Sequence, residues 1–476
     1  MTASTRRLGV PTLPAAATHL SPSSYFFVTL ASLILVIGFS RASSTLQVTV
    51  AASVLVYLTA TTIRPEHRLA TDHWLTPLNW MHMGWFLQIV LLPTVVVVLG
   101  PTAIQLAQVP DSRHLAAAVG LQTLAHVTFL CALHTVRPRR ASPVSAGPPV
   151  PGVAILLTAL VGGLALLTLF GGPGNVLNYF RGNVRSAQGA SQLAPFLVPL
   201  LGVSSVLALR QAILRQRNRP VWLLICLAGL LVGFGSSGYS RGMFATAIIA
   251  MLAMISRSWR RIPLATYVLI LLVGSLAALS LGEYRTTFLR TDGGQISVQQ
   301  AGLNESSFSP RHQVESYMRA PQYLAVIPRA LHNETTVPPS ALVSNVLAPI
   351  PVLGEPFRES TTRTHFSQEV RQRLDVVDMS PPMVGEMYWT LGLLGTVVAF
   401  IVLGWLVARL DRRFREASDP GSIFLLMFAG AWCGYLLVGS TQVLVQTIVY
   451  MGPALMILHL LRRQLADPPT PRRLPS

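Results

Sequence analysis

Residues 387–408 read MYWTLGLLGTVVAFIVLGWLVA and carry no charged side chain. A helix needs roughly 20 apolar residues to cross the hydrocarbon core of a bilayer, so this stretch predicts a membrane-spanning helix. Arg409 follows it directly, and similar apolar runs recur along the whole chain, with proline and arginine at many of their ends. We expect these spans at 24–40, 46–62, 80–100, 115–136, 151–171, 195–214, 220–236, 243–256, 263–282, 387–408, 423–439 and 444–461.

The sequence therefore predicts an all-α polytopic membrane protein with about 12 transmembrane helices. The composition agrees, because 51% of the 476 residues are hydrophobic and only 11% are charged, against about 25% charged residues in soluble domains. These values exclude a soluble globular enzyme and a disordered chain, and the repeated apolar runs exclude a single-pass receptor. The first run has no A-x-A-like cleavage site, so we expect it to be retained as a span.

The net charge is +18, and all of the positive charge comes from arginine, since the chain has no lysine. Such a charge on a soluble protein would suggest nucleic acid, but here the arginines gather in alternate loops, which is the positive-inside pattern. With the N-terminus inside, the cytoplasmic segments hold 22 arginines. The short outer loops hold Arg41, Arg113, Arg181, Arg185 and Arg241. We therefore expect both termini in the cytoplasm and no nucleic-acid partner.

This orientation divides the chain into five parts. We expect a cytoplasmic tail at 1–23, transmembrane helices 1–9 at 24–282, an extracytoplasmic loop at 283–386, transmembrane helices 10–12 at 387–461, and a cytoplasmic tail at 462–476. The loop holds nine arginines and eleven of the 18 acidic residues, and a connection of this length is usually a lid or a binding element. Helices are predicted at 312–332 and 364–378, with Ser360-Thr361-Thr362 as a cap and with Pro321 and Pro328 breaking the first.

An arginine at membrane depth is the first candidate for chemistry. Arg241 lies in Ser240-Arg241-Gly242, between two apolar runs with almost no loop, so it needs an anionic partner. A phosphate suits a guanidinium, which offers paired donors, although an arginine here could also extend to lipid headgroups. The other outward arginines could bind a pyrophosphate or form loop salt bridges; they are Arg181, Arg185, Arg285, Arg319 and Arg329.

Glu386 is the second candidate, because it stands where the long loop re-enters the membrane. A carboxylate at that depth costs several kcal/mol unless it is paired or protonated. It could accept a proton from a sugar hydroxyl, or form a structural ion pair with one of the outer arginines. His365 is an alternative general base.

No sequence motif indicates another kind of chemistry. The chain has no HExxH sequence, no Walker loop, no GxGxxG and no Cys/His cluster with metal-ligand spacing. We expect neither a metal nor a cofactor. The three cysteines lie inside apolar runs and are interpreted as small buried hydrophobic residues.

Four stretches of the chain are similar to a known family. They are Thr76-Pro77-Leu78-Asn79-Trp80, the glycine-rich loop from Gly171 to Arg181, Ser240-Arg241-Gly242, and the run from Val384 to Gly395 with its Gly-Glu-x-Tyr step at Gly385, Glu386 and Tyr388. With the number of spans and the single long loop, the chain resembles the bacterial O-antigen and oligosaccharide repeat-unit polymerases (Wzy-like).

This resemblance implies a metal-independent glycosyltransferase in the bacterial plasma membrane, with its active site facing outside. Such an enzyme transfers a saccharide from an undecaprenyl-pyrophosphate donor to another lipid-linked oligosaccharide and so builds a surface polysaccharide. The outward arginines and Tyr388 would bind the substrate, and Glu386 or His365 would be catalytic. A flippase and a chain-length regulator are the protein partners that such a role implies.

Three alternatives stay open from the sequence. An O-antigen ligase has the same donor and architecture but a different acceptor. Transferases that use lipid-monophosphate sugars typically need acidic residues in the first outer loop, and here Arg41-Ala42-Ser43-Ser44 has none. A transporter or flippase of lipid-linked saccharides commonly has six-plus-six repeats and ionisable residues within the spans, whereas these predicted spans are nearly free of charge.

Overall fold

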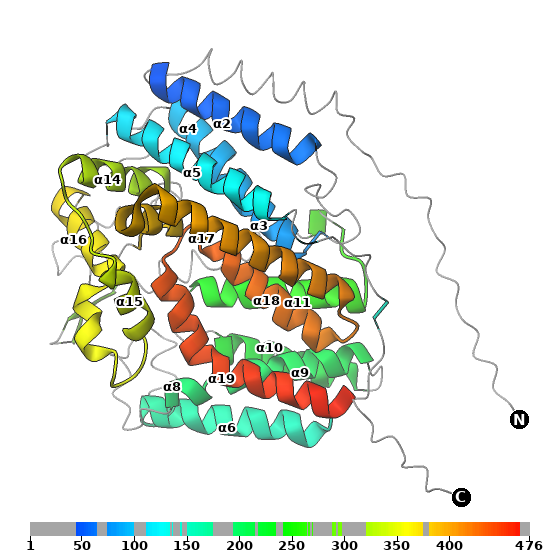
Figure 1. Cartoon of the computed structure of the whole chain (residues 1–476). Coiled ribbons are helices and arrows are strands. Elements are labelled where there is room, and N and C mark those ends of the chain that lie inside the picture. The colour runs from blue at the N-terminus through cyan, green and yellow to red at the C-terminus, as the bar shows by residue number, and fades with distance from the viewer. Residues whose placement is uncertain are drawn as a thin grey trace, which may run out of the picture.

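The computed structural model describes ten helical rods and a small group of helices that caps one end of them (Figure 1). The described residues are 44–63, 74–99, 111–133, 150–174, 194–214, 218–234, 241–263, 288–291, 294–297, 320–374 and 380–466, with a few single positions between these ranges. The predicted span 24–40 and nearly all of 263–282 lie outside the described residues.

Seven of the rods precede the long loop. They are α2 (Ser44–Ile63), the composite of α3 (Pro77–Trp85), η2 (Phe86–Leu91) and α4 (Leu92–Leu99), α5 (Ser112–Leu133), α6 (Gly152–Phe170), α8 (Ala194–Leu197) with α9 (Leu200–Leu214), α10 (Arg219–Gly229) with η4 (Leu230–Phe234), and α11 (Arg241–Ser258). Three more follow the loop: α17 (Met383–Glu416), α18 (Pro420–Tyr435) and α19 (Thr441–Ala466).

Five of these segments are long and apolar enough to cross a membrane, and five more are shorter apolar helices. Their positions match ten of the predicted spans, and most ends agree within a few residues, although α17 continues to Glu416, beyond the predicted end at 408. The structure thus describes a helical membrane protein. The count of twelve spans and the direction of the chain across the bilayer stay predictions.

Local sequence explains how the third rod begins and where it changes pitch. Thr76 caps α3, because its hydroxyl accepts a hydrogen bond from the Asn79 amide at 3.1 Å, and Pro77 occupies the first turn, where its missing N–H is not needed. The π-helical turn η2 lies just before Pro93. A proline inside a helix cannot donate to the carbonyl four residues earlier, here that of Ile89, and a π turn is one way to accommodate this loss.

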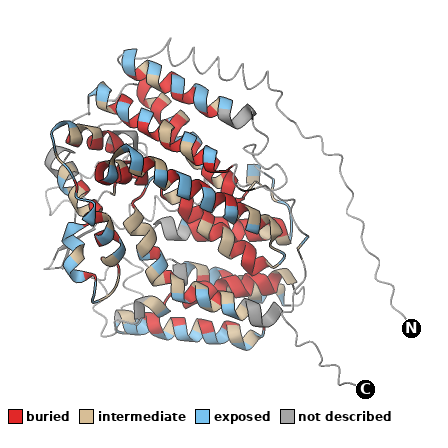
Figure 2. Ribbon diagram, viewed as in Figure 1, coloured by how far each residue is buried: buried red, intermediate tan, exposed pale blue. Residues whose placement is uncertain are grey.

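The rods pack through small residues, as is typical of membrane helices. Gly404 of α17 lies so close to α5 that an added Cβ would be 2.4 Å from the Phe129 carbonyl oxygen. One apolar core is formed mainly by α2, α3, α5, α14 and α17, and a second by α9, α11, α18 and α19. Figure 2 shows buried residues along α5, α17 and α18, whereas α2 and α6 at the two edges carry many exposed ones. The exposed apolar side chains of α6 are those a lipid-facing helix would present.

The long loop is mostly helical where it is described. It contains the strands β1 (Phe288–Thr291) and β2 (Gly294–Ser297), and then α14 (Ala320–His332), α15 (Ser340–Leu347), the 3₁₀ helix η6 (Glu355–Ser360) and α16 (Thr362–Leu374). The strands pair antiparallel, with Phe288 opposite Ser297. This short hairpin is a small addition to a loop that is otherwise helical where it is described.

The predicted loop helices need two corrections. Pro328 does not break the first helix, because α14 continues through it to His332. Pro321 lies in the first turn of α14, where proline is well tolerated. The second helix begins slightly earlier than expected, at Thr362. The predicted cap is confirmed, since the Thr361 hydroxyl accepts from the Thr364 amide at 3.2 Å.

Charged side chains hold the opposite end of the bundle together, where α9, α11 and α17 end and α18 begins. Arg210 pairs with Asp419 at 3.0 Å, and Asp419 also caps α18 through the Ser422 amide. Arg257 donates to the Ala417 carbonyl at 3.1 Å and lies over the Phe414 ring. Some of the arginines that define the predicted cytoplasmic side are therefore buried and bonded within the protein.

Candidate functional site

Glu386 lies in the first turn of α17 and is fully buried. The helix starts after Pro381-Pro382, whose fixed backbone angles suit the approach to a helix but not its interior. The Met383 amide donates to the Leu436 carbonyl at 3.1 Å, which fastens the start of α17 to the end of α18. Glu386 therefore lies at the junction between the membrane helices and the cap, which is formed by α14, α15, η6 and α16.

Three donors from three different elements contact the Glu386 carboxylate. Oε1 lies 2.5 Å from the Asn345 Nδ2 atom and 2.5 Å from the Thr362 hydroxyl, while Oε2 accepts from the Thr441 amide at 2.8 Å. Asn345 belongs to α15, Thr362 begins α16 and Thr441 begins α19. We call Asn345, Thr362, Glu386 and Thr441 the junction cluster.

Helix ends explain how this carboxylate is held, since no cation lies beside it in the described part of the chain. The N-terminus of a helix carries a partial positive charge and has amide groups without partners inside the helix. Glu386 lies in the first turn of its own helix and contacts the first residues of α16 and α19. Three helix N-termini thus converge on one buried carboxyl group.

Asn345 links the members of the cluster. Its Nδ2 atom also lies 3.1 Å from the Thr441 hydroxyl, and its Oδ1 atom accepts from the Thr362 amide at 3.0 Å. Asn345 is itself fully buried. Because both ends of its amide are used, Asn345 sets the position of the cap helices α15 and α16 relative to α19.

Two glycines shape the helix that carries Glu386. A Cβ at Gly385 would lie 2.2 Å from the Ile327 Cδ1 atom, so α14 packs directly against this turn. Gly392 has φ 68° and ψ −162° and interrupts α17. This backbone region is essentially restricted to glycine, so Gly392 separates the short segment that begins at Met383 from the long membrane helix after it.

The structure brings few of the predicted site residues together. His365 is half-buried on α16, one turn after Thr362, and no hydrogen bond joins its ring to Glu386 among the described residues. Tyr388 is half-buried and packs against the first apolar core. Arg329 is half-buried in the last turn of α14, two residues beyond Ile327, and so lies on the face of that helix away from Gly385.

The remaining predicted arginines cannot be compared with the junction cluster. Arg181, Arg185, Arg285 and Arg319 lie outside the described residues. Arg241 is the first residue of α11, but its side chain is not described. The expected ion pair between Glu386 and an outer arginine is not seen within the described ranges, where the amide and hydroxyl donors of the junction cluster take that place.

Sequence reasoning missed the three partners of Glu386. Thr362 was assigned only to a helix cap, and Asn345 and Thr441 were not considered. Asn345 gave one usable signal, because it is a polar amide in the otherwise mainly apolar stretch Ala341-Leu342-Val343-Ser344-Asn345-Val346-Leu347. A buried amide in such a context needs hydrogen-bond partners.

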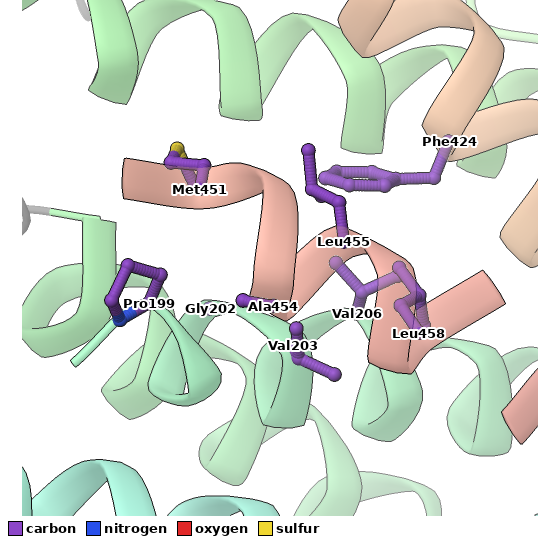
Figure 3. A pocket seen from close by; sticks show the side chains of 9 residues that line it. All are labelled: Pro199, Gly202, Val203, Val206, Phe424, Met451, Ala454, Leu455 and Leu458. Atoms are coloured by element: carbon purple, nitrogen blue, oxygen red, sulfur yellow. The ribbon is translucent and has the colours of Figure 1, made fainter. Parts of the chain in front are cut away.

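Other parts of the described structure are weaker candidates for a functional site than the junction cluster. A narrow crevice between α9, α18 and α19 is lined by apolar side chains alone (Figure 3); they are Pro199, Gly202, Val203, Val206, Phe424, Met451, Ala454, Leu455 and Leu458. It holds no side-chain group that could recognise a polar substrate. Within the described ranges, no group of three or more His, Cys, Asp or Glu residues could hold a metal ion.

Comparison with known proteins gives no match: no family model fits the sequence, and no curated protein or solved structure is significantly similar to the chain. The fold and the apolar helices define the class, which is a helical membrane protein.

Proposed function

We propose that this chain is a membrane-embedded glycosyltransferase that polymerises undecaprenyl-pyrophosphate-linked oligosaccharide repeat units at the outer leaflet of a bacterial plasma membrane. The observation that carries the proposal is the junction cluster. It places a buried carboxylate between the membrane helices and a helical cap, and a hydroxyl group from the cap lies in hydrogen-bond contact with it. The family resemblance of the sequence supplies the substrate class.

The proposed reaction is the transfer of a glycosyl group to a sugar hydroxyl. The hydroxyl loses its proton to Glu386 while its oxygen attacks the anomeric carbon of the donor. The bond from that carbon to the pyrophosphate oxygen breaks, and lipid pyrophosphate leaves with the bonding electron pair. A general base must lie within hydrogen-bond reach of the proton that it takes.

The Thr362 hydroxyl marks the position of the acceptor in this proposal. It lies 2.5 Å from Oε1 of Glu386, where the hydroxyl of an incoming sugar would have to lie. Movement of α16 away from α17 would remove Thr362 and leave room for the acceptor. The Thr441 amide and the Asn345 amide would keep the carboxylate in place during this exchange.

The leaving group needs positive charge, and the outward arginines are the candidates for it. Arg241, at the start of α11, is the one we assign to the pyrophosphate. Fixed cations aimed at a developing anion stabilise the transition state without a metal. Closure of the cap would also exclude water, which favours transfer over hydrolysis.

The test uses the purified chain in liposomes with lipid-pyrophosphate-linked repeat units and no added metal. A gel that resolves repeat number should show a ladder of products. Glu386→Gln should abolish the ladder, whereas Glu359→Gln, which changes an exposed carboxylate in the same cap, should not. No ladder from the unaltered chain would contradict polymerisation. Product formed only with an added acceptor would indicate a ligase, and movement of intact substrate across the bilayer would indicate a flippase.

A further inference from the structure

The cap helix α15 (Ser340–Leu347) buries two polar side chains and exposes two valines. Ser344 and Asn345 are buried against the protein, with exposed fractions of 5% and 0%. Val343 and Val346 lie on the opposite side and are 56% and 50% exposed. A surface helix of a soluble domain usually exposes polar side chains, so the two exposed valines of α15 need an explanation.

The turn after α15 extends this apolar surface. Val352 is 68% exposed and Leu353 is 67% exposed. Val352 has φ 66°, a conformation that is rare for a β-branched residue and costs free energy that the surrounding structure must supply. We call Val343, Val346, Val352 and Leu353 the apolar edge of the cap.

Three backbone amides around the apolar edge donate hydrogen bonds within the same turn. The amides of Ile350, Leu353 and Gly354 donate to the carbonyls of Leu347, Pro351 and Ile350 at 2.7–2.9 Å. Gly354 permits this tight turn, because an added Cβ would lie 2.3 Å from the Ala348 carbonyl oxygen. A segment that contacts hydrocarbon must satisfy its own backbone in this way.

The depth of the apolar edge follows from the junction cluster. Asn345, in the middle of α15, contacts Thr441, the first residue of α19, which is long and apolar enough to cross a membrane. Figure 1 places α15 beside the start of α19, and the two helices are in contact. α15 therefore lies beside the end of a helix that is long and apolar enough to cross a membrane.

Charged residues follow the apolar edge directly. Glu355, Arg358 and Glu359 are exposed on η6. Apolar side chains next to charged ones, at the end of membrane helices, are typical of a segment that lies at the boundary between acyl chains and headgroups.

We infer that the apolar edge of the cap is a membrane contact: Val343, Val346, Val352 and Leu353 insert among the acyl chains at the surface of the leaflet on the cap side. The occupant of this surface is lipid and not a protein. The cap then rests on the bilayer through α15, and its polar face encloses the junction cluster. This inference does not depend on the proposed enzymatic activity.

The experiment measures the depth of single labelled positions. Cys131, Cys226 and Cys433 are replaced by serine or alanine in the full-length chain. A single cysteine from Leu353→Cys then carries the fluorophore NBD, and the protein is placed in nanodiscs that contain doxyl-labelled phospholipids. Leu394→Cys, from a 75% exposed position on α17, serves as the lipid control, and Glu359→Cys serves as the water control.

We expect the probe at Leu353 to be quenched by doxyl lipids as at Leu394, to emit at a shorter wavelength than at Glu359, and to lose quenching by iodide. Val343→Cys repeats the measurement on α15 and guards against disturbance of the strained turn. Iodide quenching equal to that at Glu359, at both positions, would overturn the inference. Protection from both quenchers would also overturn it, and a disulfide between two Leu353→Cys chains would then identify a second copy as the occupant.

Discussion

The amide of Thr441 donates a hydrogen bond to Oε2 of Glu386 at 2.8 Å and joins the first turns of α19 and α17, although 55 residues separate the two in the sequence. The amide is free to do so because the first N–H groups of a helix have no partner within it. A buried carboxylate is thereby held by helix ends, without an arginine beside it among the described residues.

Ion pairs stabilise the other end of the bundle. There, Arg210 and Asp419 form an ion pair at 3.0 Å, and Arg415 pairs with Asp411 at 2.7 Å. The Asp411 carboxylate also accepts from the Leu78 amide at 3.2 Å. An ion pair therefore joins α9 to the start of α18, and a backbone amide of α3 binds a carboxylate of α17 at this end. The two ends differ in chemistry, and each can be tested separately.

Glu386→Ala should destabilise the protein strongly. The change removes the acceptor of the Thr441 amide and one of the partners of the Asn345 amide and the Thr362 hydroxyl, and we expect a loss on the order of 3 kcal/mol. Glu386→Gln keeps the volume and one acceptor oxygen, so its loss should be smaller. The fraction of SDS that half-unfolds the protein in mixed micelles measures both. Equal stability of Glu386→Ala and the unaltered chain would show that the cluster does not hold the cap.

Gly392→Ala should destabilise the break in α17. Its backbone angles of φ 68° and ψ −162° suit glycine alone, and the strain of another residue there costs about 1–3 kcal/mol. Gly120→Ala is the matched control, since Gly120 is exposed in α5 with no neighbouring heavy atom within 4 Å of an added Cβ. That control should be neutral or slightly stabilising. The same SDS titration compares them, and a neutral Gly392→Ala would mean that α17 can run through as a regular helix.

Asp419→Ala should cost more stability than Asp419→Asn. Asparagine can still accept the Ser422 amide and cap α18, so the difference between the two variants should be about 1 kcal/mol. Both remove the charge that faces Arg210, which is only 4% exposed. Arg412→Ala, which breaks the more exposed pair with Glu416, should cost less than about 0.5 kcal/mol. Equal stability of Asp419→Ala and Asp419→Asn would contradict the role of Asp419 as the N-terminal cap of α18.

Arg241→Ala should reduce polymerisation on the order of 100-fold or more if this arginine neutralises the leaving pyrophosphate. Arg241→Lys should recover part of the activity, because lysine keeps the charge but not the paired donors. Arg409→Ala is the control, since Arg409 is exposed and stacks on Trp405 at 4.0 Å. Product ladders from equal amounts of folded protein give the comparison. Full activity of Arg241→Ala would remove this residue from the proposed site.

Sequence patterns predicted much of the architecture because the signals are local. An apolar run long enough to cross a bilayer is visible within one window of the chain, and the structure contains helices at ten of the predicted positions. The cap residue of α16, Thr361, could also be predicted from the sequence, because the Thr364 amide that it binds lies only three residues away in the chain. Pro328 misled the prediction, because packing of α14 against α5 and α17 outweighs one lost hydrogen bond.

The sequence alone determined that this chain forms membrane helices, where most of them lie, and that Glu386 needs a partner. Only the tertiary structure decided which partner. Asn345, Thr362 and Thr441 lie 41, 24 and 55 residues from Glu386, and nothing in a local pattern brings them together. Their meeting depends on how α15, α16 and α19 pack at the start of α17, and a buried carboxylate accepts whichever donors that packing supplies.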